Sequence, residues 1–196
     1  MKKTFIHHLG ICPSPSEDDI SKYEQQGMGV LLSDFALTKK FKTDDLIWFW
    51  TCFKGAYQDH EHCWQYFHKN DEFDGMEVRK FLNSIYKPFY LQATMTAKET
   101  LFLANLRNKN NEVKIYRGTH GKQPLGPSWT LNLDRAVWFG SRFQKETPYI
   151  YEATISTYDI DCIWNEREEE EIFMLPQVLR KRAKKIKGYY LEDYIA

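Results

Sequence analysis

This chain lacks an excess of charge of either sign. Its 196 residues include 27 lysines and arginines and 27 aspartates and glutamates, so the formal net charge is zero. Bulk charge therefore gives no argument for nucleic acid or for an acidic substrate. A long hydrophobic run is missing too, because the longest one, LIWFWTCF at 46–53, is far too short to span a bilayer.

Cysteine is scarce and scattered. The four cysteines stand at positions 12, 52, 63 and 162, and no two of them form a CxxC pair. A disulfide framework is therefore not indicated, and a reducing cytoplasm fits the pattern better. Two histidines interrupt the apolar residues of the N-terminal segment MKKTFIHHLGIC, so no secretory signal peptide is predicted. We expect a cytoplasmic globular protein with one domain, or with one domain and a helical extension.

The two halves of the chain have different patterns. Over 42–69 aromatic residues recur at spacings of three and four, which predicts a helix. Further helices are predicted from about residue 20, over 75–86 and over 96–109. Short strands follow over 112–118, 148–156, 170–176 and within 185–196, with a short helix over 132–143 that Asn132 or Asp134 can cap. The sequence therefore predicts an α+β fold, with a mostly helical region at 1–110 and a strand-rich region at 111–196.

Two polar motifs lie close together in the second half. Arg117 ends a predicted strand and precedes Gly118, and a guanidinium in that position suits bidentate binding of phosphate or carboxylate. A surface salt bridge is the competing interpretation. In the triplet Ser128-Trp129-Thr130, an extended backbone places both hydroxyls on one face and the indole on the other. The hydroxyls could orient a ligand amide or a carboxylate, and the alternative is a turn with a core tryptophan.

Four consecutive glutamates, 168–171, lead directly into the apolar run IFML. A strand would place Glu169 and Glu171 on one face, and Glu168 and Glu170 on the other. Neighbouring carboxylates raise each other's pKa and can divide the work of orienting a hydroxyl and accepting a proton. A solvated acidic edge is the alternative, but the apolar run ties the last glutamate to a buried strand.

Two further clusters of polar residues are weaker indications of a functional site. His60, His62, Cys63 and His68 invite a zinc interpretation, but a helix places positions 60 and 62 on different faces, and a surface helix is favoured. The basic run at 180–187, RKRAKKIK, could contact a phosphate backbone, although such runs are more often one exposed face of a strand or helix. We expect no metal.

The order of the motifs is more specific than any one of them. The series consists of Tyr116-Arg117-Gly118, Ser128-Trp129-Thr130, Ala136 through Phe139, and Glu169-x-Glu171. This order resembles the arginine-serine-glutamate class of ADP-ribosyltransferases, and the residues of the motifs look especially like those of its small bacterial and phage members. The resemblance covers roughly residues 112–190 and implies two small β-sheets packed around an NAD cleft, with a helical N-terminal region.

The resemblance also implies residue roles. Arg117, beside Gly118, would contact the phosphates and ribose of NAD. Ser128 would position the catalytic glutamate and the nicotinamide side, with Thr130 in support and Trp129 as a packing residue or a wall of the cleft. Phe139 would stack near nicotinamide, and Arg142 would reach phosphate. Glu171 would stabilise the cationic transition state, and Glu169 would prepare the acceptor. Glu168 and Glu170 are the competing pair.

The implied activity is NAD-dependent mono-ADP-ribosylation of a macromolecule, with an arginine side chain of a protein as the expected acceptor. NAD would be a co-substrate. An intracellular toxin or a phage–host conflict effector would fit, with an antitoxin or inhibitor protein as a further partner. The alternatives are ADP-ribosylation of RNA or DNA bases, simple cleavage of NAD by a glycohydrolase, and a catalytically inactive binding module.

Overall fold

The structure is a computed structural model that describes residue 31 and residues 43–59, 75–123, 125–142, 147–165 and 168–192. The chain divides into two compact units, Met1–Thr94 and Met95–Ala196. The predicted helix near residue 20 and the histidine and cysteine cluster of His60, His62, Cys63 and His68 lie outside the described residues.

In the first unit the described elements are helices. They are α2 (Thr43–Asp59), α3 (Gly75–Ile85) and α4 (Pro88–Gln92). The aromatic residues of α2 form the core, since Phe49, Trp50 and Phe53 have no exposed surface. The Trp50 ring meets those of Phe49 and Phe53 edge to face, with 5.1 Å between the centroids of Trp50 and Phe53. The three- and four-residue spacing that predicted this helix is therefore the spacing of its buried face.

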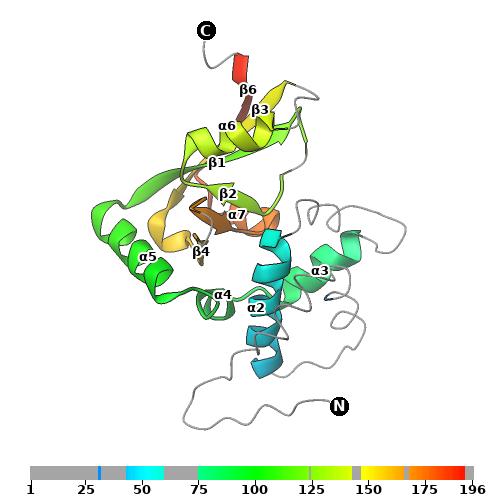
Figure 1. The fold of residues 1–196 in the computed structure, drawn as a ribbon, viewed down its shortest axis with the longest axis vertical. Coiled ribbons are helices and arrows are strands. Elements are labelled where there is room, and N and C mark those ends of the chain that lie inside the picture. The colour runs from blue at the N-terminus through cyan, green and yellow to red at the C-terminus, as the bar shows by residue number, and fades with distance from the viewer. Residues whose placement is uncertain are drawn as a thin grey trace. The chain divides into compact units, whose positions relative to one another are not determined.

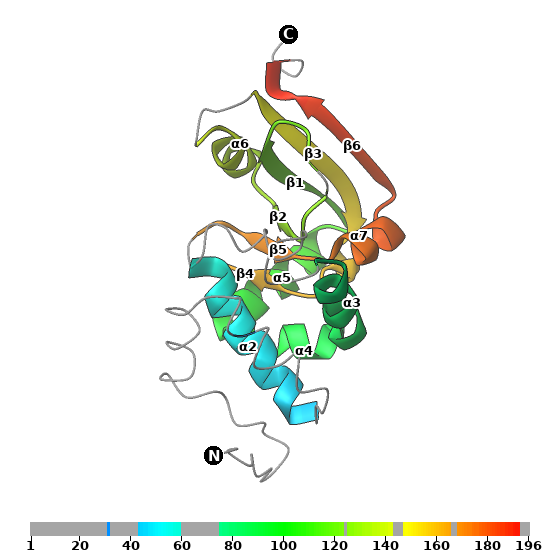
Figure 2. The same ribbon diagram turned by 90° about the vertical axis from the view of Figure 1, so that its right-hand side faces the viewer.

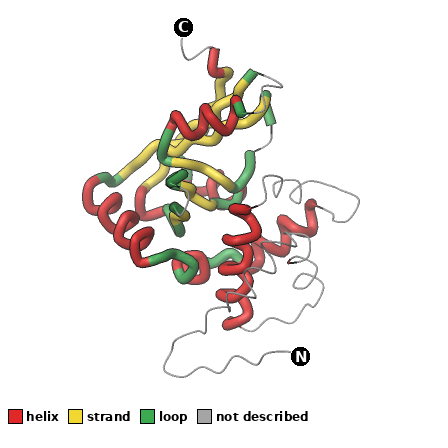
Figure 3. Tube along the Cα trace, viewed as in Figure 1, coloured by secondary structure: helices red, strands yellow, loops and turns green. Residues whose placement is uncertain are grey.

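The second unit combines one sheet with helices, so the α+β prediction is confirmed. Its helices are α5 (Ala97–Lys109), α6 (Leu133–Ser141), the 3-10 turn η2 (Thr157–Asp159) and α7 (Pro176–Arg182). Its strands are β1 (Glu112–His120), β2 (Ser128–Thr130), β3 (Pro148–Ser156), β4 (Ile163–Trp164), β5 (Glu171–Phe173) and β6 (Lys185–Tyr190). Figures 1 and 3 show how these elements follow one another.

The described strands form one antiparallel sheet in the order β4-β5-β2-β1-β3-β6, where two small sheets were expected. The sheet nevertheless has two parts. All of β1 pairs with β3, and the half β1-β3-β6 is continuous (Figure 2). Only Tyr116 and Thr130 join β1 to β2. Because only one of the three residues of β2 is in register with β1, the two three-stranded halves meet at a single register position.

Local sequence signals explain the ends of the helices. Thr96 and Glu99 form a capping box at the start of α5, each side chain bonding the other's backbone N–H. Asn132 caps α6 by accepting hydrogen bonds from the N–H groups of Asp134 and Arg135. Pro176 opens α7, where its missing N–H costs nothing. The helices predicted over 96–109 and 132–143 are therefore present and slightly shorter.

The core of the second unit lies on one face of the sheet. Four strands each contribute an inward-facing side chain to this core: Ile115 of β1, Trp129 of β2, Ala153 of β3 and Ile172 of β5. Helix α5 contributes Leu103. Helix α6 packs against β1 (Figure 1). A Cβ at Gly118 would stand 1.6 Å from the carbonyl oxygen of Ala136, so only glycine allows this approach. Gly118 therefore permits the packing of α6 against β1. The sequence predicted that this glycine ends the strand, but β1 continues to His120.

Among the described residues, no helix is long and apolar enough to cross a membrane.

Candidate functional site

The sheet register brings several of the predicted site residues onto one face. Glu171 of β5 is paired with Thr130 of β2, and Thr130 is paired with Tyr116 of β1. Directly paired residues project from the same face of a sheet, and so do residues two apart in one strand. Ser128 therefore lies on this face as well. The four side chains form a polar row at the position where the two halves of the sheet meet.

Ser128 and Glu171 are in direct contact. The hydroxyl of Ser128 donates a hydrogen bond of 2.5 Å to Oε1 of Glu171. Glu171 is only 6% exposed, and a buried carboxylate is costly unless such donors satisfy it. A hydroxyl bound to a carboxylate is among the shorter and stronger hydrogen bonds in proteins. Two residues 43 positions apart thus form one fixed pair on neighbouring strands.

Arg117 joins this pair through the backbone. Its Nη1 donates a hydrogen bond of 2.9 Å to the carbonyl oxygen of Ser128. Its guanidinium lies against Gly126, where a Cβ would stand 2.3 Å from Nη2. Beside the single register pair of Tyr116 and Thr130, the bond from Arg117 to Ser128 is a second link between β1 and β2. By the alternation of β1, Arg117 projects from the face opposite to Tyr116, so it reaches Ser128 through the backbone carbonyl while the Ser128 hydroxyl binds Glu171 on the other face.

Trp129 lies on the other side of β2. It is 1% exposed and belongs to the apolar core of the unit. Its indole N–H donates to the carbonyl oxygen of Gly126 at 3.1 Å, which ties β2 to the preceding loop. The alternation predicted for the triplet 128–130 is observed, with Ser128 and Thr130 on one face and the indole in the core.

The four glutamates do not form a continuous strand. Only Glu171 belongs to β5, while Glu168 and Glu170 have φ angles of 57° and 48°. This left-handed backbone is uncommon for residues other than glycine and breaks the two-residue period. The predicted alternation over 168–171 is therefore not observed. Glu168 is exposed, and Glu169 is held beside β2 because Thr130 Oγ1 donates to its carbonyl oxygen at 2.7 Å.

Phe139 and Arg142 form a second cluster at the end of α6. The guanidinium carbon of Arg142 lies 5.1 Å from the centre of the Phe139 ring and 5.3 Å from the centre of the Trp138 ring. Trp138 is 48% exposed. An arginine above an aromatic face is held by a cation–π attraction. The structure thus brings these two predicted residues together with each other and adds Trp138 to them.

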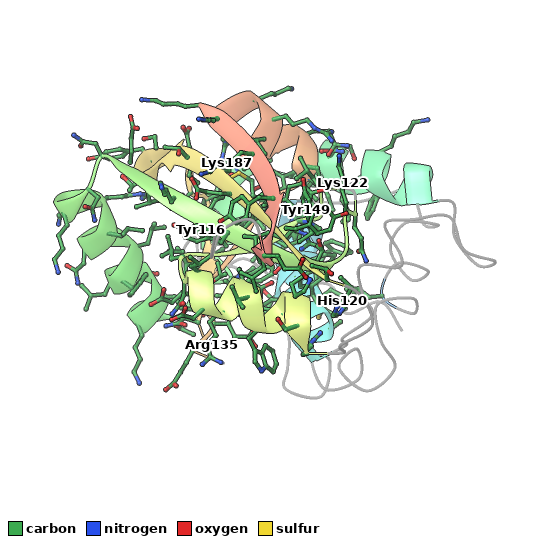
Figure 4. All side chains as sticks on the ribbon, turned by 90° about the horizontal axis from the view of Figure 1, so that it is seen from above. Tyr116, His120, Lys122, Arg135, Tyr149 and Lys187 are labelled. Atoms are coloured by element: carbon green, nitrogen blue, oxygen red, sulfur yellow. The ribbon has the colours of Figure 1, made fainter. Side chains whose placement is uncertain are left out.

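On the same face of the sheet, a carboxylate separates two lysines. Glu152 of β3 is in register between Tyr116 and Lys187, and Figure 4 labels both of these neighbours. Its Oε1 lies 3.3 Å from Nζ of Lys114 and 3.2 Å from Nζ of Lys187. The basic charge of β6 is therefore partly neutralised within the sheet.

Sequence reasoning missed Tyr151, which fixes the loop between β1 and β2. Its hydroxyl donates to the carbonyl oxygen of Gln123. Burial raises the pKa of Tyr151 above its usual value, and Tyr149 raises it further, while the nearby Arg117 lowers it. A lone tyrosine within an alternating strand gives no signal of this role, because the partner is a backbone carbonyl in a loop.

Within the ranges that the structure describes, no group of three or more histidine, cysteine, aspartate or glutamate residues could hold a metal ion. The chemistry of the described site is that of hydroxyl, carboxylate and guanidinium groups.

Comparison with known proteins identifies no relative. No protein-family description, curated protein or solved structure matches the chain significantly.

Proposed function

We propose that this protein is an NAD-dependent mono-ADP-ribosyltransferase that modifies a macromolecule, with a protein arginine as the acceptor. One observation carries the proposal. The arginine, serine and glutamate of the motif series come from three separate segments and are linked through β2: Arg117 binds the backbone carbonyl of Ser128 from one face of the sheet, and the Ser128 hydroxyl binds Glu171 on the other.

The chemistry follows from these groups. In the first step the bond between ribose and the nicotinamide nitrogen breaks, and its electron pair leaves with nicotinamide. The ribose carbon becomes cationic, and a carboxylate held in a protected position stabilises that charge. Glu171 is such a carboxylate, since Ser128 and the sheet fix it. Arg117 offers a guanidinium of the kind that binds phosphate.

The second step needs a nucleophile. An acceptor guanidinium nitrogen forms a new bond to the ribose carbon and loses a proton. In the proposed assignment the carboxylate of Glu169 takes that proton. Support comes from the position of Glu169, two residues before Glu171 and bonded through its carbonyl oxygen to Thr130 of the same row.

The architecture also supports the proposal. The resemblance implies two small sheets, and the observed sheet consists of two three-stranded halves joined by one register pair. The row of polar side chains lies at the position where these halves meet.

The basic run favours a protein acceptor over nucleic acid. Arg182 is bonded to Asp161 at 2.5 Å, Lys184 to Glu112, and Lys187 to Glu152. Three of the six basic residues between 180 and 187 thus contact acidic groups of the same chain. Nucleic-acid binding draws on cations that are free to replace counterions at phosphates.

Labelled NAD tests the proposal directly. The protein is incubated with NAD labelled in its adenosine part and with a cell lysate, and the products are then treated with protease or with nuclease. We expect protease-sensitive label and release of nicotinamide. Nuclease-sensitive label would assign the acceptor to RNA or DNA, and nicotinamide without labelled macromolecule would assign a glycohydrolase. If no nicotinamide were released, the protein would be a catalytically inactive binding module.

Substitution of the buried glutamate tests the assignment of the site. Glu171→Gln keeps the shape of the side chain and removes the charge, so we expect nicotinamide release to fall by about 10²–10³-fold. Glu168→Gln is the matched control, because Glu168 is exposed, and we expect wild-type rates. If Glu170→Gln were the inactive variant and Glu171→Gln active, the pair 168/170 would carry the chemistry instead.

A further inference from the structure

The turn before β5 is held in an unusual conformation. Glu168 and Glu170 both have left-handed backbone angles, and neither is a glycine. Such residues persist where the surrounding structure fixes them, and they concentrate at functional sites. The hydrogen bonds that fix this turn are therefore the starting point for inferring its role.

Asn165 provides two of these contacts. Its side-chain Oδ1 accepts a hydrogen bond of 2.9 Å from the N–H of Glu170. Its backbone carbonyl accepts one of 3.1 Å from the N–H of Glu168. The same residue thus holds the turn on both sides of Glu169.

Asn165 is in turn held by Glu99 of α5. The backbone N–H of Asn165 donates to Oε1 of Glu99 at 2.6 Å, and Oε2 of the same carboxylate accepts from the N–H of Thr96 at 2.7 Å. Glu99 is 2% exposed. One buried carboxylate therefore caps α5 and also anchors the residue that fixes the turn.

The other side of the turn is fixed by β2. Thr130 Oγ1 donates to the carbonyl oxygen of Glu169, and the N–H of Asn132 donates to Thr130 Oγ1 at 3.1 Å. The backbone of Glu169 is thus held between Asn165 and Thr130. Glu171 has further contacts of its own, because β5 also pairs with β4 and Ser128 binds its carboxylate.

We propose that Asn165, anchored by Glu99, is a positioning residue that sets the direction of the Glu169 side chain and so determines whether cleaved ADP-ribose reaches the acceptor or water. This inference rests on the proposed function. In transfer, the acceptor nitrogen bonds to the ribose carbon and gives its proton to Glu169. In hydrolysis, water takes the place of the acceptor and gives up its proton to the solvent.

The test compares Asn165→Ala with Asn165→Asp in the full chain. Alanine removes the acceptor for the Glu170 N–H, while aspartate keeps an oxygen at the same position. For Asn165→Ala we expect nicotinamide release within about twofold of wild type and labelled acceptor reduced about tenfold, the effect of one lost hydrogen bond. Asn165→Asp should restore transfer, and combining it with Glu168→Gln keeps the charge of the turn unchanged. An equal loss of cleavage and transfer in Asn165→Ala would overturn the positioning role.

Hydrogen exchange separates this inference from the proposed function. We expect the Glu170 amide to exchange about tenfold faster in Asn165→Ala than in wild type, and at the wild-type rate in Asn165→Asp. Unchanged exchange in Asn165→Ala would refute the anchor, whatever the activity. If exchange rose as expected but the ratio of transfer to hydrolysis stayed constant, the anchor would stand and its role in acceptor choice would be refuted. A wild-type protein that releases no nicotinamide would instead refute the proposed function.

Discussion

Arg117 is held by its surroundings as much as by its own strand. Its guanidinium binds the Ser128 carbonyl and lies against Gly126, whose missing side chain leaves the necessary space. The loop that carries Gly126 is fixed in turn by Trp129 and by the bond between Tyr151 and Gln123. The direction of one arginine therefore depends on a loop as well as on β1.

Gly126→Ala should displace the arginine without unfolding the protein. The new Cβ would meet only the end of a flexible side chain, so we expect the melting temperature to change little. The KM for NAD should rise about tenfold if Arg117 binds phosphate. In an Arg117→Ala background the same substitution should have no further effect, and a double-mutant cycle measures this. Additive effects would contradict the mechanism.

Tyr151 should make the protein less stable in alkali. Its pKa is raised in the folded state, so above about pH 10 the unfolded chain loses this proton more readily than the folded one. The free energy of unfolding should therefore fall as the pH rises through that range. Tyr151→Phe should cost about 1 kcal/mol at pH 8, from the lost hydrogen bond, and should lose less stability between pH 10 and 11. Urea unfolding measures both effects.

The control for that measurement is Tyr158→Phe, because Tyr158 is 66% exposed. We expect this variant to follow the wild-type pH dependence. If Tyr151→Phe lost stability in alkali as steeply as wild type, other groups would account for the loss.

At the scale of elements, the sequence predicted what depends on neighbouring residues and missed what depends on distant ones. The helix over 96–109 and the strand over 148–156 were found because capping residues and alternation are local signals. The strand predicted from residue 170 begins at Glu171, because the left-handed angles at Glu168 and Glu170 depend on contacts with Asn165 and Thr130. The prediction that Arg117, Ser128 and Glu171 belong to one site rested on the order of the motifs alone. A single sequence does not show which strands pair.

The contact between α6 and β1 should be the least tolerant of added volume. Gly118→Ala would place a Cβ 1.6 Å from a backbone oxygen and 2.8 Å from the Gly140 nitrogen, so the helix must move. We expect a loss of at least about 3 kcal/mol in the free energy of unfolding. Gly140→Ala is the matched control on the facing helix, where the nearest atom, of Pro148, is 3.2 Å away. That change should stay within about 1 kcal/mol, because alanine favours a helix.

At the scale of the whole molecule, α5 belongs with the sheet. The second unit begins at Met95, and α5 contributes Leu103 to the core and Glu99 to the turn. Arg107 also donates to the carbonyl oxygens of Thr157 and Ile160. The sequence analysis divided the chain at residue 110, where predicted helices give way to predicted strands.

A fragment of residues 95–196 should fold by itself, and a fragment of residues 111–196 should not. The shorter fragment exposes the surface that Leu103 covers and leaves the Asn165 N–H without its carboxylate. Circular dichroism should show a cooperative thermal transition for the first fragment alone. Equal transitions in both would mean that α5 is dispensable for the sheet.

The strand order has a consequence for how the protein is made. Chains leave the ribosome from the N-terminus, so β1, β2 and β3 emerge before β5 and β6. Each half of the sheet is completed by one of these late strands, and Ser128 finds its carboxylate only when Glu171 has emerged. A nascent chain therefore holds Arg117 and Ser128 for some time without the buried glutamate. Under the proposed function, cleavage of NAD would begin only after β5 has emerged and Glu171 has paired with Ser128.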